Sequence, residues 1–160
     1  MLKSGDWNES VTKETSGGVE IVRLQRTARS VVMSLTVEEA HSIYDELVTR
    51  KMQQFNEGNS EAMVLMFEPQ GVLVDKKNNK CSFGREEIRT TLEPYAKLGK
   101  MDFKTPKREV IPLGADSFFV RIDYQTTVIE SGIVLTGTIE QIFKKNGEEW
   151  LISYEIYLEG

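Results

Sequence analysis

The sequence contains only one cysteine and one histidine among its 160 residues. A single cysteine, Cys81, excludes a disulfide bond within the chain. One histidine and one cysteine that lie far apart do not supply the ligand spacing of a zinc site. The chain also lacks a phosphate-binding loop, a Gly-x-Ser-x-Gly nucleophile motif and a dinucleotide-binding fingerprint. We therefore expect no metal site and no cofactor.

Basic residues and long apolar runs are scarce as well. Lysine and arginine number 20 against 25 acidic residues, which gives a net charge of -5, and no basic stripe departs from this average. The balance argues against binding to nucleic acid or to an anionic membrane. No segment approaches the ~20 apolar residues of a membrane span, and the first residues carry no apolar signal segment. The expected compartment is the cytoplasm.

Residues 1–35 differ in composition from the rest of the chain. Residues 1–18 are polar and include a Ser-Gly-Gly sequence, which is typical of a tail or linker. Residues 19–24 have the content of a strand, whereas arginines recur at every third position from 23 to 29, as on a helical turn. We expect an N-terminal tail or linker with a short strand or a helical turn. One domain should follow over residues 36–160, a length that can bury a core.

Helices are predicted in the first half of this domain. The first should run from Thr36 to about Glu57, because Thr36 and Glu39 form a capping box and the apolar residues that follow share one face. Two shorter helices are expected over residues 61–67 and 85–93. We expect the proline that follows the last of them to break or kink it.

The remaining sequence predicts a sheet. Strand-like segments are separated by turn residues at 71–75, 101–113, 117–129, 133–144 and 150–158. Hairpin turns between the later ones favour a curved, mostly antiparallel sheet with the helices packed against it, so the fold class is α+β. The strand at 133–144 is apolar on both faces and needs cover on both. The helices can cover only one face, which predicts a homodimer formed through the sheet.

Five short motifs together resemble the nuclear-transport-factor-two-like superfamily. The motifs are Phe55-Asn56-Glu57-Gly58-Asn59, Met66-Phe67, Gly71-Val72-Leu73-Val74-Asp75, Phe83-Gly84-Arg85-Glu86-Glu87-Ile88 and Asn146-Gly147-Glu148-Glu149-Trp150. The likeness covers about residues 36–159 and extends to small, uncharacterised animal domains of this superfamily. It implies a cone-shaped fold with a pocket at the wide end. Members include steroid isomerases, a scytalone dehydratase, SnoaL-like polyketide cyclases and a kinase oligomerisation domain, so the fold does not specify a function.

Three charged residues are predicted to meet in this pocket. Lys51 lies seven positions after Tyr44, about 20° from it around the helix, and a buried ammonium needs a partner. Asp75 at a strand end and Glu140 in mid-strand could supply one. By resemblance, Asp75 matches the proton-shuttling aspartate of the steroid isomerases and Glu140 their protonated oxyanion-hole acid. Lys51 replaces an oxyanion-hole tyrosine and could pair with Glu140, so the steroid reaction is not carried over.

Each of the three has a plainer interpretation. Lys51 could extend its amine to the mouth of the cone, Asp75 could be a solvated turn residue, and Glu140 could pair across strands with Arg121 or lie at a dimer contact. The predicted pocket walls are apolar or aromatic: Tyr44, Val48, Phe55, Phe67, Leu92, Tyr124, Ile142 and Trp150.

Three functions are compatible with this pattern. The first is a small-molecule binding domain for a hydrophobic or amphipathic ligand. The second is a proton-transfer enzyme with Asp75 as the base and Lys51 stabilising an oxyanion, which requires an unpaired Lys51 or a raised pKa at Asp75. The third is a protein–protein interaction or assembly domain. A closed, mostly apolar cavity of ~300 Å³ or more beside Lys51 would separate the first two from the third.

Overall fold

The structure is a computed structural model that describes residues 7–16, 19–28 and 34–159, and the chain divides into two units between residues 33 and 34. In the first unit, β1 (Trp7–Ser16) pairs antiparallel with β2 (Val19–Ala28). Residues 7–16 are therefore a strand and not the predicted tail. The expectations for positions 17, 18 and 29 lie outside the described residues.

The second unit begins with α1 (Val37–Asn56), and its capping box forms as predicted. The Thr36 amide donates to the Glu39 carboxylate at 2.8 Å, and the Glu39 amide donates to the Thr36 hydroxyl at 3.2 Å. The face that α1 buries carries Ala40, Tyr44 and Leu47. The helical spacing of apolar residues thus predicted the buried face correctly.

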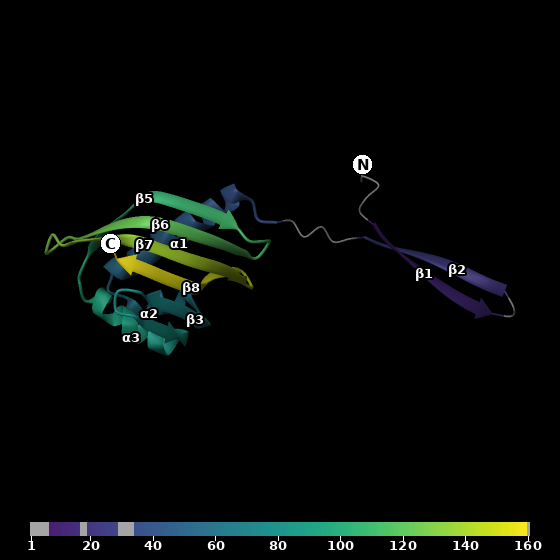
Figure 1. Ribbon diagram of the computed structural model, residues 1–160, viewed down its shortest axis with the longest axis horizontal. Coiled ribbons are helices and arrows are strands. Elements are labelled where there is room, and N and C mark those ends of the chain that lie inside the picture. Colours follow the sequence, from purple (N-terminus) through teal and green to yellow (C-terminus); the bar gives the residue numbers. More distant parts are fainter. Residues whose placement is uncertain (1–6, 17–18, 29–33, 160) are drawn as a thin grey trace. The chain divides into compact units, whose positions relative to one another are not determined.

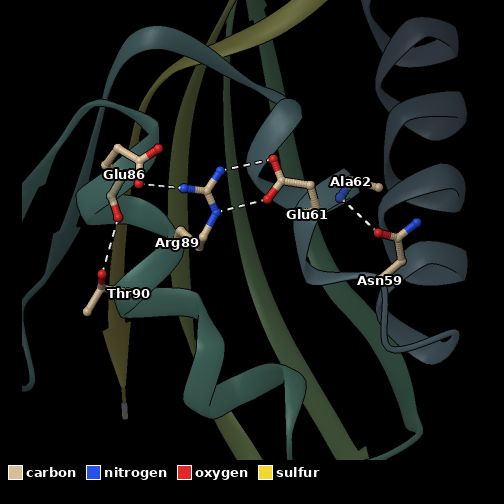
Figure 2. Close-up of polar contacts among 6 residues, drawn as sticks. All are labelled: Asn59, Glu61, Ala62, Glu86, Arg89 and Thr90. Carbon is tan, nitrogen blue, oxygen red and sulfur yellow. Dashed lines mark hydrogen bonds and ion pairs between the residues drawn. The ribbon is translucent and has the colours of Figure 1, made fainter.

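Two shorter helices pack beside each other. In α2 (Ser60–Leu65) the N-cap is Asn59, whose side chain accepts from the Ala62 amide at 3.1 Å. The third helix, α3 (Gly84–Ala96), continues through its proline instead of breaking there, because the proline lies in the last turn and few backbone bonds depend on it. Figure 2 shows that Arg89 of α3 joins the two helices through a two-pronged contact with Glu61 of α2.

Six strands form one sheet in the order β4-β3-β8-β7-β6-β5. They are β3 (Phe67–Asp75), β4 (Lys80–Phe83), β5 (Met101–Pro112), β6 (Ser117–Val128), β7 (Val134–Asn146) and β8 (Glu149–Glu159). Only the pair β3–β8 is parallel. Figure 1 shows β5 to β8 side by side across α1. The predicted α+β class with a curved, mostly antiparallel sheet is confirmed, while the four-residue β4 was too short to predict.

One face of the sheet, called the inner face below, packs against the helices and carries the core. In β6 the inner residues alternate along the strand, as the sequence predicts, and Phe118, Val120 and Ile122 are at most 2% exposed. Together with Tyr44 of α1 and Phe143 of β7 they form the aromatic and aliphatic centre of the core. The opposite face of the sheet is called the outer face.

Candidate functional site

A cavity of about 140 Å³ lies between α1, α3 and the inner face of the sheet. Its wall is mostly aromatic and aliphatic, with a few polar groups. Its lining consists of Tyr44, Val48, Lys51, Met52, Phe55, Met63, Leu92, Tyr95, Met101, Phe103, Ile122, Tyr124, Thr126, Leu135, Ile139, Gln141, Glu155 and Tyr157.

Close backbone packing shapes one aromatic wall of the cavity. Tyr124 of β6 lies opposite Gly137 of β7, and a side chain at position 137 would overlap both the Tyr124 ring and the carbonyl oxygen of Leu158. The glycine therefore lets the Tyr124 ring lie against the sheet, where it stacks on Phe103 with ring centroids 6.2 Å apart.

A partly buried ion pair provides the first polar group of the cavity. The Lys51 ammonium donates to a Glu155 carboxylate oxygen at 3.0 Å, and the Gln141 side-chain amide donates to the same oxygen at 2.5 Å. The side chains of Lys51 and Glu155 are 20% and 5% exposed. These three residues are called the Lys51 cluster. Removing charges from water is costly, so each charge here depends on its partner.

A β-bulge explains why Glu155 faces the cavity. Phe143 and Ile152 pair on the inner face, and Gln141 and Glu155 also pair there, but the register shifts between these two pairs. The extra residue, Ser153, anchors the bulge by donating to the Ile142 carbonyl at 3.1 Å. One extra residue exchanges the faces of every side chain that follows. Glu155 therefore points inward although Ile152, three positions earlier, does so too.

A chain of hydroxyl groups provides the second polar group. The Tyr95 hydroxyl donates to the Tyr157 hydroxyl at 3.3 Å, and Tyr157 in turn bonds to the Asp75 carboxylate. Asp75 also accepts from the Asn78 amide at 2.9 Å and from its side chain at 2.6 Å. These residues are called the Asp75 chain, and Tyr95 and Tyr157 are its members in the cavity wall.

The pKa values of the Asp75 chain follow from these contacts. Burial alone would raise the pKa of Asp75, but the hydrogen bonds from Asn78, Tyr157 and the Lys77 amide outweigh it and hold the pKa below its ordinary value. Burial, followed by the hydrogen bonds with Tyr95 and Asp75, raises the pKa of Tyr157. At neutral pH the aspartate is therefore ionised and the tyrosine protonated.

Tyr44 connects the cavity with a surface ion pair. Burial, with a contribution from the nearby Glu155 charge, raises its pKa, while Arg108 opposes the shift. The Arg108 guanidinium lies 5.6 Å from the Tyr44 ring centroid and pairs with Asp45. The tyrosine therefore remains a neutral aromatic wall of the cavity over the physiological range.

The structure brings together six of the residues predicted for the pocket. Lys51 of the charged trio and five of the predicted wall residues line the cavity: Tyr44, Val48, Phe55, Leu92 and Tyr124. Asp75 is 3% exposed but lies behind Tyr157 and outside the lining. It is the last residue of β3, paired with Lys80 and Tyr157, and it is buried. The plainer interpretation of a solvated turn residue is therefore wrong.

The predicted inward position of Glu140 is wrong. Glu140 lies opposite Arg121 in the sheet and pairs with it at 3.4 Å, outside the cavity, so the cross-strand alternative describes it correctly. Its neighbour Gln141 faces inward instead. Because strand β7 is apolar on both faces, its alternation did not indicate which set of residues points to the helices.

Three predicted wall residues also lie elsewhere. Phe67 is fully buried in the core behind the cavity. Trp150 packs on the Phe118 ring with centroids 5.1 Å apart. Ile142 lies on the outer face, because it is two positions from Glu140 along β7 and therefore points the same way.

Sequence reasoning missed Glu155, Gln141, Tyr95 and Tyr157. Glu155 is the only acidic residue within the apolar run 150–158, and that isolation was an available signal. A charge within such a run needs a buried partner. The bulge at Ser153, which turns it toward Lys51, left no comparable mark in the sequence.

No metal centre or membrane helix is visible within the described ranges. Across residues 7–16, 19–28 and 34–159, no group of three or more His, Cys, Asp or Glu side chains is placed to hold a metal ion. In the part of the chain that the structure describes, no helix combines the length and apolar character needed to cross a membrane.

Comparison with known proteins gives matches in structure only. No protein-family model and no curated protein sequence matches the chain. A protein described as a calcium/calmodulin dependent protein kinase II association domain, from Xanthomonas campestris, has a TM-score of 0.66 at 21% identity, over 73% of this chain and 85% of that one. A nuclear-transport-factor-two-like protein of unknown function from Pseudomonas putida has a TM-score of 0.64 at 13% identity, over 77% and 87%.

A third similar structure carries an enzyme's name. It is described as a scytalone dehydratase from Novosphingobium aromaticivorans, with a TM-score of 0.63 at 11% identity, over 75% of this chain and 83% of that one. At these identities the matches establish architecture. The chain has the nuclear-transport-factor-two-like fold: a long helix and two shorter ones enclosed by a curved sheet, with a cavity between them.

Proposed function

We propose that this domain binds a small hydrophobic or amphipathic molecule in the cavity beside Lys51. The observation that carries the proposal is the combination of a mostly apolar wall with a few convergent polar groups, which is the usual composition of a ligand site. A plain packing core would be filled, and it would not retain a buried ion pair at the edge of an open space.

The volume of the cavity limits the size of the ligand. At about 140 Å³ it does not reach the ~300 Å³ set above as the criterion for a ligand cavity, which is the lower size of sites for drug-sized ligands. The proposal is therefore confined to a smaller molecule. Apolar cavities of roughly 150 Å³ are known to hold benzene. The cavity therefore suits a molecule with about one ring better than a steroid or a polyketide.

A cavity-filling substitution tests this proposal. Leu135→Phe adds volume to a partly buried lining residue, whereas Leu113→Phe makes the same change at a residue that is 53% exposed and outside the lining. Ligand-observed NMR with toluene, phenol and indole should show binding to the wild type and to Leu113→Phe, and loss of binding with Leu135→Phe. Absence of binding to the wild type by all three compounds would contradict the proposal.

The structure does not meet the conditions that the proton-transfer alternative required. It required an unpaired Lys51 or an Asp75 with a raised pKa. Lys51 is paired with Glu155, the pKa of Asp75 is lowered, and Asp75 does not line the cavity. We therefore do not propose a reaction that uses these two residues as base and oxyanion donor.

We also propose that the domain forms a homodimer through the outer face of the sheet. The strand registers align a row of apolar residues across five strands of that face: Ile111, Phe119, Ile142, Tyr154 and Val72. Ile111 of this row is 42% exposed, and Val134, on the same face of β7, is 52% exposed. A continuous apolar row of this kind marks an interaction surface. The similar protein from Xanthomonas campestris is described as an association domain, which supports an assembly role.

Light scattering on purified protein tests the dimer. Wild type should be dimeric at micromolar concentration, and Phe119→Glu should be monomeric because it places a charge in the middle of the apolar row. Gln125→Glu, on the same face of β6 but outside the row, is the matched control and should remain dimeric. A monomeric wild type would contradict this proposal without affecting the ligand site.

A further inference from the structure

The Lys51 cluster and the Asp75 chain offer opposite hydrogen-bonding partners, while the lining also carries the hydroxyl groups of Tyr44, Tyr124 and Thr126. In the Asp75 chain the direction of every proton is determined, because an ionised carboxylate only accepts. Tyr157 must donate to Asp75, and Tyr95 donates to Tyr157. The Tyr95 proton is therefore already used, and what remains for a molecule in the cavity is a lone pair on its oxygen. This end of the cavity accepts a hydrogen bond.

The Lys51 cluster offers the reverse. An ammonium group has three N–H donors and no acceptor. Among the described residues, Lys51 donates only to Glu155, so further N–H groups remain for a ligand. The Glu155 oxygen that faces Lys51 is already shared with the Gln141 amide. This end of the cavity therefore donates a hydrogen bond to a ligand atom.

Charge and spacing narrow the ligand further. Lys51 and Glu155 are the only charged residues of the lining, and they neutralise each other. An anion would meet the Glu155 carboxylate and a cation the Lys51 ammonium, so a neutral molecule is favoured. Glu155 and Tyr157 occupy successive inward positions of β8, roughly 7 Å apart by strand geometry. The Lys51 cluster and the Asp75 chain are thus attached to successive inward positions of one strand.

This inference rests on the proposed ligand-binding function. We infer that the cavity takes a neutral, single-ring aromatic compound that carries a carbonyl group toward Lys51 and a hydroxyl group toward Tyr95. The aromatic walls, including Phe55, Phe103 and Tyr124, would hold the ring. The two polar ends would select its orientation.

A set of matched compounds tests the inference on the wild-type protein. The probes are 3- and 4-hydroxyacetophenone at pH 6.5, measured by isothermal titration calorimetry. The corresponding methylacetophenones lack the hydroxyl, the ethylphenols lack the carbonyl, and the hydroxybenzoates carry a negative charge. At least one hydroxyacetophenone should bind, and its three analogues should each bind roughly tenfold more weakly or worse. A site built to hydrogen-bond a ligand group rejects the analogue that lacks it.

Variants then assign each preference to its residue. The double variant Lys51→Met/Glu155→Gln removes both charges together, so it leaves no stranded carboxylate. It should lose the preference for the ketone over the ethylphenol and keep the preference for the hydroxyl. Tyr95→Phe should show the opposite pattern. Tyr154→Phe changes a tyrosine on the outer face and should alter neither preference. Thermal melting confirms that each variant is folded.

The possible results separate the inference from the function beneath it. If toluene, the ethylphenols and the hydroxyacetophenones bind equally, the cavity binds ligands but the two polar ends do not select them, and the inference is wrong. Tighter binding of a hydroxybenzoate would overturn the neutral-ligand part. If no compound binds, including toluene, the proposed function itself fails.

Discussion

Asp75 and Glu155 are buried carboxylates on neighbouring strands, and the molecule holds them in different ways. They are 3% and 4% exposed, and both face the helices from the adjacent strands β3 and β8. Asp75 is surrounded by neutral donors from a turn and from Tyr157. Glu155 instead meets a cation and one amide. With similar burial, Asp75 is thus stabilised by neutral hydrogen-bond donors, whereas Glu155 depends on the charge of Lys51.

The two carboxylates also differ in their position relative to the cavity, because Glu155 lines it and Asp75 does not. Asp75 has its charge satisfied by its own turn, and it reaches the cavity only through the oriented hydroxyl of Tyr157. Lys51 and Glu155 both line the cavity, and under the proposed function a ligand would meet the N–H groups of Lys51 that Glu155 does not use. The predictions below test this contrast by removing one member at a time, from the largest expected effect to the smallest.

The largest effect is expected for Lys51→Met. The substitution keeps most of the side-chain volume but leaves the Glu155 carboxylate buried without its cation. The free energy of unfolding at pH 7 should fall by about 3 kcal/mol, as when one partner of a buried pair is removed. Chemical denaturation measures it. Adding Glu155→Gln should restore much of the lost stability, whereas adding Glu140→Gln should not. If Glu140→Gln restored it, Glu140 and not Glu155 would be the partner of Lys51.

Asp75→Asn should cost less, about 2 kcal/mol, because it removes a charged acceptor from several hydrogen bonds but leaves no unpaired ion. The effect should depend on pH. The folded-state pKa of Asp75 lies below its ordinary value of 3.8, so its stabilisation is complete above about pH 5. It is lost as the pH falls through 3.8 and then through the lower folded pKa.

Denaturation curves of the wild type and of Asp75→Asn between pH 2 and pH 7 (roughly the range that linkage theory makes informative) would check this sign. The difference in stability between the two proteins should narrow toward acid pH. A difference that widens toward acid pH would mean that the aspartate is protonated more readily in the folded state, contrary to its hydrogen bonds.

Tyr157→Phe should have a smaller effect, about 1 kcal/mol, since it removes one neutral hydroxyl that links Tyr95 to Asp75. Thermal and chemical denaturation both measure it. The matched control is Tyr154→Phe, three residues earlier on the outer face, which should change stability less. Equal losses in the two variants would argue that the hydroxyl chain contributes nothing beyond ring packing.

Glu140→Gln should have the smallest effect, less than about 0.5 kcal/mol. Its partner Arg121 is 54% exposed and the two charges lie 3.4 Å apart, and exposed pairs of this kind contribute little. Combined with Lys51→Met, its effect should simply add. A loss of several kcal/mol, or strong coupling to Lys51, would show that Glu140 and not Glu155 faces the cavity.

Much of the fold could be read from the amino-acid sequence because the signals are local. The Thr36 capping box, the 3.6-residue spacing of the face around Tyr44 and the alternation in β6 each depend on residues close together in the chain. The part of the cavity wall that α1 contributes follows from the same spacing, including Lys51. The five ordered motifs indicated the cone fold in addition.

The partner of Lys51 depended on features that are not local. The sequence by itself determined that a lysine lies on the buried face of the first helix and that it needs a carboxylate as its partner. Only the tertiary structure decided which one. Strand β7 is apolar on both faces, so its inward set was ambiguous, and the bulge at Ser153 reverses the alternation of β8. A shift of one residue exchanges the two faces of a strand, and it is strand pairing, not local pattern, that brings Glu155 to Lys51.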